Sequence, residues 1–199
     1  WQCMRYADIY LMAAEAINEL DGPEAAAPYL REIRKRAFPN NPEKVDAYMA
    51  SVTTSKIAFF NAIVNERALE FCGESLRKAD LIRWNLLSTK MNEAKAKLTR
   101  LANRQGEYAD LPEKIYYKTA SDGESLIIYG LEHGHTDTEG AALNYESSKG
   151  WFISNGVNTL TVDKINSLFQ RDPDTRQFWP IWQVFIDSSN GLLKNDYGY

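Results

Sequence analysis

The densest group of charged residues lies in the segment NERALEFCGESLRKADLIRW, residues 65–84. Two carboxylates four residues apart share one helix face. After a glycine, two guanidiniums and a third carboxylate recur every three residues on the next helix. These five residues are Glu66, Glu70, Arg77, Asp80 and Arg83. An antiparallel arrangement of the two helices would place the two glutamates opposite the two arginines.

Two kinds of chemistry use such a group. A pair of carboxyl groups flanking a cleft can serve as the acid and base of a glycoside hydrolase. Carboxylates that are matched one for one by arginines can instead fix the pairing and register of two helices. Here the arginines match Glu66 and Glu70 in number, so no carboxyl group is isolated enough to have a raised pKa. We therefore expect a substantially buried structural ionic network and no catalytic residue.

Both histidines of the chain lie in the segment LEHGHTDTEG, residues 131–140. In an extended conformation His133, His135 and Asp137 would share one face and offer the nitrogen and oxygen ligands of a metal site. No second group of ligands lies nearby in the sequence to complete such a site. We expect a solvated, glycine-flanked loop without a metal, and no other motif indicates a cofactor.

Aromatic and asparagine residues gather between residues 144 and 158. Sugar rings present flat faces of C–H bonds that pack on aromatic rings, while their hydroxyl groups bond to polar side chains. Tyr145, Trp151, Phe152 and Asn155 are therefore candidate glycan-binding residues. The alternative is that these rings close a small hydrophobic core, since aromatic side chains dominate core energetics.

The N-terminal half of the chain has the apolar spacing of paired helices. A first helix, from about residue 6 to residue 20, carries two apolar stripes and must pack on more than one side. Gly22 and Pro23 mark its end and the start of a second helix, which extends to about residue 37. The broader stripe comprises Tyr6, Ile9, Tyr10, Ala13, Ala16, Ile17 and Leu20, and the narrower one comprises Ala7, Leu11 and Ala14.

A second pair of helices follows an irregular segment that is expected to hold one short helix. One helix extends from a cap at Thr54 or Ser55 to Cys72, which we expect to be a small buried hydrophobe. The other begins near Glu74 and is expected to run towards Asn103. Two helix pairs of similar size indicate a tetratricopeptide-like architecture.

Beyond Gly106 turn residues become frequent. Residues 125–129 and 157–162 are expected to form short strands, and residues 163–170 a short helix capped by its first residue. The aromatic tail, residues 178–199, is expected to pack back across the helices.

Composition excludes several classes of function. Of the 199 residues, 44% are hydrophobic and 25% are charged, as in ordinary globular proteins. The net charge is only −4 and no basic stripe could neutralise phosphates, so nucleic acid is not an expected partner. No apolar run approaches the length needed to cross a bilayer. Cys3 and Cys72 lack the spacing of a zinc or redox motif.

Three blocks of the sequence resemble the SusD/RagB family of outer-membrane nutrient-binding proteins. RYADIYLMAAEAINEL followed by LREIRKRA resembles the family's tetratricopeptide helix pair. ER, EF, GE, R and DLIRW, within residues 65–84, resemble its signature. PIWQVFIDSSNGLLKNDYGY resembles its ending, although Trp182 replaces a proline and Asp196-Tyr197 replaces the proline that precedes Gly198.

The resemblance implies the C-terminal half of a lipoprotein that binds oligosaccharides without catalysis. It also implies delivery of the glycan to a SusC-like TonB-dependent transporter at the extracellular face of the cell outer membrane. By this resemblance, the lipid anchor and the first two helical units belong to an N-terminal half. The chain begins at Trp1 without an initiator Met, so we expect it to be a fragment of a longer chain. An apolar patch is then expected near Trp1, Met4 and the first helix pair.

The expected fold is mainly α, with tetratricopeptide-like, SusD-like helix pairs and a smaller irregular, partly β lobe. The helical-repeat region is expected over residues 1–106, and the lobe and tail over residues 107–199. Two other functions stay open: a helical-repeat scaffold that binds protein, and a glycoside hydrolase. An exposed aromatic platform would favour a glycan ligand, an apolar concave groove would favour a peptide, and two carboxylates flanking an open cleft would favour the hydrolase.

Overall fold

The structure, a computed structural model, describes residues 4–154 and 156–196 and divides into two compact units, Trp1–Asp80 and Leu81–Tyr199. Helices predominate, and the strands form one three-stranded sheet and one two-stranded sheet among the described residues. The predicted fold class, mainly α with a smaller, partly β lobe, is confirmed. The predicted boundary near residue 106 stays a prediction. Within the described ranges, no helix combines the length and apolar character that crossing a membrane requires.

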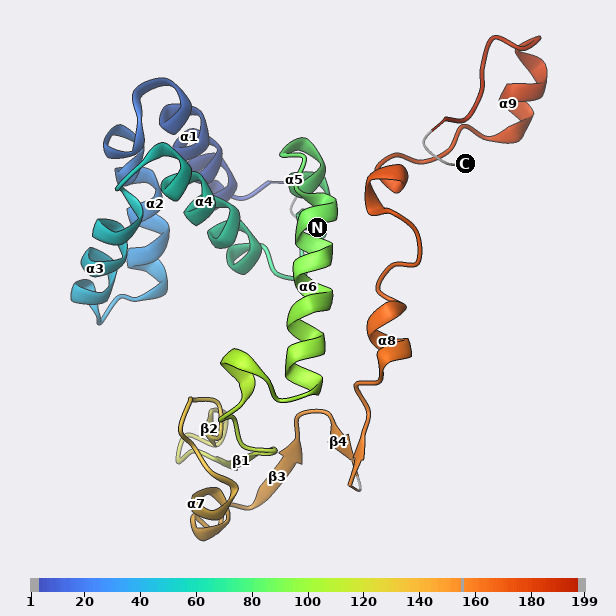
Figure 1. Cartoon of the computed structure of the whole chain (residues 1–199). Coiled ribbons are helices and arrows are strands. Elements are labelled where there is room, and N and C mark those ends of the chain that lie inside the picture. Colours follow the sequence, from blue (N-terminus) through green and yellow to red (C-terminus); the bar gives the residue numbers. More distant parts are fainter. Residues whose placement is uncertain (1–3, 155, 197–199) are drawn as a thin grey trace. The chain divides into compact units, whose positions relative to one another are not determined.

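The first unit is helical (Figure 1). α1 and α2 form a tight pair because Gly22 between them adopts φ 94°, and its N–H donates to the carbonyls of Ile17 and Asn18. Pro23 then begins α2, where its missing N–H costs no helix hydrogen bond. α1 also packs against α4, and α3 packs on α2 and α4. The helices are α1 (Tyr6–Asp21), α2 (Pro23–Ala37), α3 (Pro42–Val52), α4 (Lys56–Glu70) and α5 (Arg77–Arg83), of which α5 extends into the second unit.

The core of the first unit consists of apolar side chains from α1 to α4. They are Ala7, Leu11, Ala14, Ala26, Leu30, Ile33, Val45, Met49, Phe59, Ala62, Ile63 and Val64. α1 contributes its narrower stripe to this core. Of the broader stripe, Ile9 is 45% and Leu20 is 79% exposed. Met4 and Tyr6 are exposed as well, so apolar side chains of α1 and of Met4 face solvent. Trp1, the other residue near which the patch was expected, lies outside the described residues.

α4 begins and ends at identifiable signals. The hydroxyl group of Ser55 accepts a hydrogen bond from the Ala58 N–H, so Ser55 and not Thr54 is the cap. Cys72 is exposed, and the prediction of a buried Cys72 is wrong. The helix ends at Glu70, and the buried side chain that follows it is Phe71.

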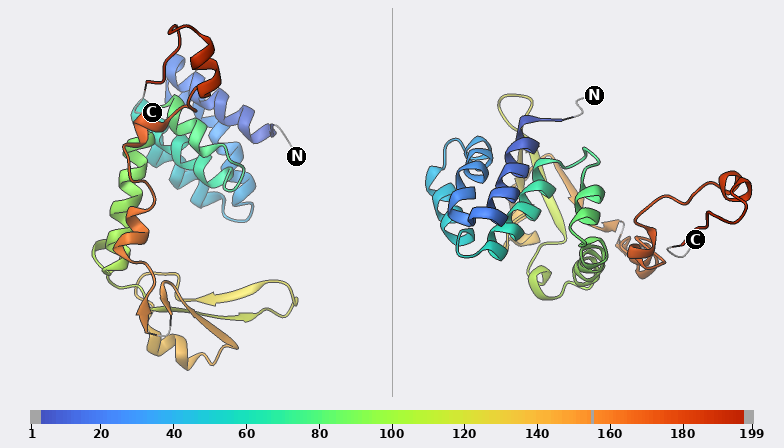
Figure 2. Two further views of the ribbon diagram at one scale, coloured as in Figure 1. Left: turned by 90° about the vertical axis from the view of Figure 1, so that its right-hand side faces the viewer. Right: turned by 90° about the horizontal axis from the view of Figure 1, so that it is seen from above.

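The helix expected from residue 74 towards residue 103 is divided into α5 and α6 (Leu87–Ala102). Asn85 adopts φ 55°, and the Leu86 N–H turns back to the Leu81 carbonyl at 2.8 Å, which ends α5. Asparagine reaches this left-handed conformation more easily than most residues. α6 packs against α8 (Val162–Asn166), which runs beside it in Figure 2, and against the short 3-10 helix η2 (Pro173–Arg176).

The three-stranded sheet has the order β2-β1-β3, with the central strand antiparallel to both neighbours. The strands are β1 (Lys114–Thr119), β2 (Leu126–Tyr129) and β3 (Ser147–Gly150), and the short 3-10 helix η1 (Gly106–Tyr108) precedes them. α7 (Asp137–Ala142) packs on β1, where Gly140 lies against the ring of Tyr116. The strand predicted at residues 125–129 is confirmed, whereas β1 and β3 were not predicted.

The strand predicted at residues 157–162 is shorter than expected. β4 (Ile153–Ser154) and β5 (Val157–Asn158) form a two-residue antiparallel pair. The chain then leaves the strand because Thr161 caps α8, its hydroxyl oxygen accepting a hydrogen bond from the Lys164 N–H. The cap of this helix is therefore Thr161 and not Asp163.

The side chain of Asn195 forms two hydrogen bonds with the backbone of Ile181 in the C-terminal segment. The amide of Asn195 accepts a hydrogen bond from the Ile181 N–H at 2.7 Å and donates one to the Ile181 carbonyl at 3.0 Å. The enclosed residues include α9 (Gln183–Ser188), in which the ring of Phe185 meets the ring of the preceding Trp182 edge to face at 5.8 Å. The packing of this tail across the helices stays a prediction.

Candidate functional site

Arg67 is the centre of a buried ionic cluster in the first unit. Its Nε donates to Asp80 Oδ2 at 2.7 Å, and its Nη1 donates to Asp8 Oδ1 at 2.6 Å. The exposed fractions of the Arg67, Asp8 and Asp80 side chains are 4%, 12% and 6%. Hydrogen bonds between ionised partners are stronger than neutral ones. One guanidinium with two carboxylates thus ties together α4, α1 and α5.

Glu70 lies at the end of α4 and pairs with two arginines from earlier in the chain. Arg5 Nη1 donates to Glu70 Oε1 at 2.8 Å, and the same guanidinium contacts the two carboxylate oxygens of Glu74 at 2.9 and 2.6 Å. Arg36, in the last turn of α2, also pairs with Glu70. Burial alone would raise the pKa of Glu70, but the hydrogen bonds from Arg36 and Arg5 outweigh it and lower that pKa.

Glu66 faces Arg34 of α2, with Arg34 Nε 3.1 Å from Glu66 Oε2. Both atoms are buried, yet neither has a hydrogen-bond partner, so the contact is an ion pair without the alignment of a hydrogen bond. Burial raises the pKa of Glu66, and Arg34 offsets only part of the effect. The expectation that no carboxyl group here has a raised pKa is therefore wrong at Glu66.

Arg77 and Arg83, the remaining members of the predicted network, make other contacts as well. Arg77 Nη1 donates to the Val64 carbonyl at 2.8 Å, which links the start of α5 to α4. The guanidinium carbon of Arg83 lies 4.3 Å from the centre of the Trp84 ring, within the second unit. The predicted carboxylates Glu66, Glu70 and Asp80 thus each pair with an arginine from outside the predicted set of five. These arginines are Arg34 for Glu66, Arg5 for Glu70 and Arg67 for Asp80.

A signal for Arg67 and Asp8 was present in the sequence. Arg67 follows Ile63 and Val64 by four and three residues, and Asp8 precedes Leu11 by three, so both lie on the helix faces that are buried. Charged residues are seldom fully buried unless they are paired. A charged residue at a position that periodicity assigns to the core therefore indicates a buried ion pair.

The arrangement of these carboxylates is that of structural charge pairs. A glycoside hydrolase needs two carboxyl groups on either side of the space that holds the sugar. Glu66 is 4% exposed, and both Glu66 and Glu70 lie against guanidiniums. This geometry favours helix pairing over acid–base chemistry.

The structure brings only some of the candidate glycan-binding residues together. Trp151 and Phe152 follow β3 directly, and Trp151 is 42% exposed. The Phe152 carbonyl accepts hydrogen bonds from the N–H and the hydroxyl group of Thr159, both at 2.6 Å. Tyr145 precedes β3, about 20 Å away along an extended chain, and Lys118 Nζ lies 5.0 Å from its ring centre. Asn155 lies outside the described residues.

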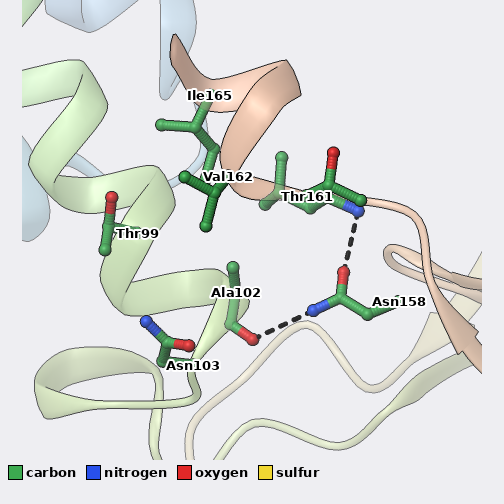
Figure 3. Close-up of a pocket in the computed structure, with 8 residues that line it drawn as sticks. Thr99, Ala102, Asn103, Asn158, Thr161, Val162 and Ile165 are labelled. Atoms are coloured by element: carbon green, nitrogen blue, oxygen red, sulfur yellow. Dashed lines mark hydrogen bonds between the residues drawn. The ribbon is translucent and has the colours of Figure 1, made fainter.

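A pocket of about 190 Å³ lies between the C-terminal end of α6 and α8 (Figure 3). Asn158 of β5 forms part of its wall. The Asn158 amide donates to the Ala102 carbonyl at 3.3 Å and accepts a hydrogen bond from the Leu160 N–H at 2.8 Å. The pocket is lined by Thr99, Ala102, Asn103, Asn158, Leu160, Thr161, Val162 and Ile165, and we call it the α6–α8 pocket.

The three residues considered as metal ligands have different partners. His133 Nδ1 hydrogen-bonds with Asp110 Oδ1 at 2.7 Å. His135 Nδ1 accepts a hydrogen bond from the Gly130 N–H at 3.1 Å. Asp137 begins α7 and accepts hydrogen bonds from two backbone N–H groups at the start of β1. Among the residues with described positions, no group of three or more potential ligands could hold a metal ion.

Comparison with known proteins identifies the family. The SusD family matches this chain over residues 1–199. The chain belongs to the SusD family. A curated relative, the SusD-like protein P25 of Formosa agariphila, is 43% identical over 83 residues, which are 42% of this chain and 15% of the relative. The matched part of this SusD-family chain thus spans a small fraction of that relative's length. No solved structure matches the chain.

Proposed function

We propose that this chain belongs to a non-catalytic protein that binds oligosaccharides at the extracellular face of the outer membrane and delivers them to a SusC-like TonB-dependent transporter. The observation that carries this proposal is the match to the SusD family over residues 1–199. Membership of this family suggests glycan binding in polysaccharide utilisation. A lipid anchor elsewhere in the full-length protein would hold it to the membrane.

The second unit offers local support for glycan binding. Trp151 combines a large ring with partial exposure, and a ring of this kind can pack against the C–H face of a sugar. The carbonyl of Phe152, the next residue, accepts a hydrogen bond from Thr159. Thr159 lies between Asn158 and Leu160, which both line the α6–α8 pocket. Trp151 and the α6–α8 pocket therefore form the region where we expect the glycan to bind.

The binding of a glycan is tested by titrating the full-length protein with a panel of oligosaccharides in a calorimeter. Trp151→Ala is expected to weaken binding about fivefold, the effect of losing roughly 1 kcal/mol of ring packing. Trp182→Ala is the matched control, since Trp182 is another exposed tryptophan outside this region. Equal affinities of the wild type and Trp151→Ala would exclude Trp151, and failure to bind every oligosaccharide would contradict the proposed function.

Delivery to a transporter needs a separate experiment. Full-length protein isolated from outer membranes in mild detergent is expected to copurify with a TonB-dependent transporter. Removal of the lipidated cysteine should release the protein from the membrane without altering its affinity for the glycan. Isolation of the anchored protein without a transporter would contradict this part of the proposal and leave glycan binding intact.

A further inference from the structure

We infer that the α6–α8 pocket is a subsite for one neutral sugar ring of the bound glycan. This inference rests on the proposed function. It adds a location, a charge class and a size for the part of the ligand that enters the protein (Figure 3).

The lining of the pocket indicates an uncharged ligand. Among the described residues that line it there is no aspartate, glutamate, lysine or arginine, and their polar groups are amides and hydroxyls. An ionised sugar would lose hydration on entering without gaining a charged partner, which is costly. Uronic acids and sulfated sugars are therefore disfavoured, whereas neutral hexoses or pentoses are suited to this lining.

The polar groups of the pocket have hydrogen-bonding capacity left over. Within the described part of the chain, the Asn103 side chain makes no hydrogen bond, so its amide can both donate and accept. Thr161 Oγ1 accepts a hydrogen bond from the Lys164 N–H and keeps its own hydrogen to donate. Thr99 Oγ1 donates to the Lys95 carbonyl and keeps its lone pairs to accept. Such a set matches sugar hydroxyl groups, each of which donates and accepts.

The apolar part of the pocket limits the size of what enters. Ala102, Val162 and Ile165 present methyl groups that can contact the C–H groups of a sugar ring. The volume of about 190 Å³ is smaller than the roughly 300–1,000 Å³ of pockets for drug-sized ligands. One ring can therefore occupy the pocket while the rest of the oligosaccharide stays outside.

Substitutions of Asn103 test the inference. The full-length protein is titrated with neutral gluco-, manno-, galacto- and xylo-oligosaccharides and with an oligogalacturonate. With the neutral oligosaccharide that binds best, Asn103→Ala and the nearly isosteric Asn103→Asp are both expected to weaken binding about tenfold, because they remove the amide donors. Asn61→Ala is the matched control, since Asn61 is an exposed asparagine of α4. Thermal melts verify that the variants remain folded.

The outcomes separate this inference from the proposed function. If Asn103→Ala binds the neutral oligosaccharide with an affinity within about twofold of that of the wild type, the subsite is overturned. The proposal that the protein binds a glycan would still stand. Tighter binding of the oligogalacturonate than of any neutral oligosaccharide would also overturn it. Absence of binding to the whole panel would contradict the proposed function and the subsite together. A loss confined to the two Asn103 variants would support the subsite.

Discussion

Arg67 is a buried cation that pairs with two carboxylates, and its removal would take this partner away from both Asp8 and Asp80. Arg67→Met is expected to lower the free energy of unfolding by about 3–5 kcal/mol, because uncompensated buried charges are strongly unfavourable. Urea unfolding at neutral pH measures this loss.

A surface arginine provides the control for Arg67. Arg31 forms an ion pair with Asp46 in which the side chains are 35% and 66% exposed. Arg31→Met is expected to cost less than about 1 kcal/mol, since solvent screens exposed pairs. Similar losses for the two variants would show that burial of the Arg67 cluster contributes nothing.

Glu66 and Glu70 lie one turn apart on α4 and should respond to pH in opposite directions. The folded-state pKa of Glu70 lies below its ordinary value of 4.5, so its stabilising contribution is present above pH 4.5 and is lost as the pH falls through that lowered pKa. The pKa of Glu66 is raised above 4.5, so its ionisation costs stability as the pH rises from 4.5 through the raised pKa.

Two glutamine variants, unfolded in urea across this pH range, measure these opposite responses. Glu70→Gln is expected to be less stable than the wild type at neutral pH, with a difference that shrinks in acid. The free energy of unfolding of Glu66→Gln, relative to that of the wild type, is expected to increase as the pH rises above 4.5. If the stabilities of the two variants, relative to the wild type, changed with pH in the same direction, the opposite pKa shifts of Glu66 and Glu70 would be contradicted.

Among the elements, α7 and β1 meet at a contact that only glycine permits. A Cβ atom at Gly140 would lie 2.3 Å from Cδ2 and Cε2 of the Tyr116 ring, and the Tyr116 hydroxyl is bonded to Asp137. Gly140→Ala is expected to destabilise the protein by about 1–3 kcal/mol, as overpacking does. The added cost should fall in a Tyr116→Leu background, which a double-mutant cycle measures. An unchanged cost would mean that the ring is not the obstacle.

The exposed broader stripe of α1 should promote self-association. Monomeric proteins rarely expose contiguous apolar patches of more than a few hundred Å². A double variant, Ile9→Lys with Leu20→Lys, is expected to shift concentrated protein of this chain towards the monomer without loss of stability, because both side chains lie outside the core. Sedimentation velocity measures the shift. Glu19→Lys is the control, since Glu19 is an exposed polar residue of the same helix, and it should leave the proportions of monomer and oligomer unchanged.

Local signals were sufficient to predict most helices, whereas contacts between distant residues were not predictable. Gly22 and Pro23 mark the first helix pair because stop and start signals act within a few residues. The break at Asn85 was missed because apolar residues continue at helical spacing on either side of it. The pairing of Arg5 with Glu70 joins residues 65 positions apart, which periodicity within one helix cannot show.

The candidate glycan-binding residues illustrate the same limit. Trp151 and Phe152 are neighbours in the sequence and stay together in the structure. Tyr145 is separated from them by β3, a strand that the sequence analysis did not predict, because its residues are small and polar and it is held by pairing with β1. The α6–α8 pocket combines residues 99–103 with residues 158–165, and this juxtaposition depends on the packing of α8 on α6.

For the molecule as a whole, the small net charge and the uncharged pocket predict little dependence of binding on salt. Screening affects interactions between charges, a neutral sugar carries none, and none of the described residues that line the α6–α8 pocket is charged. The dissociation constant for a neutral oligosaccharide is expected to change less than about twofold between low and high ionic strength. Calorimetric titrations in buffers of increasing sodium chloride measure it, and a steep salt dependence would indicate an ionic binding mode.

The Asp8–Arg67–Asp80 cluster also restricts how this sequence can evolve. Substitution of Arg67 takes the shared cation away from two buried carboxylates, and substitution of either aspartate takes one buried partner away from Arg67. Each of these single changes is expected to cost stability, so each intermediate would be selected against. Replacement of all three by apolar residues would restore a stable core, but it requires several changes that are harmful one at a time. Across descendants of this chain the three positions should therefore covary, being retained as a set or lost as a set. In an alignment of the family, the presence of arginine at position 67 should therefore correlate with aspartate at positions 8 and 80. This correlation should be stronger than the one between each aspartate and the residues next to it in the sequence.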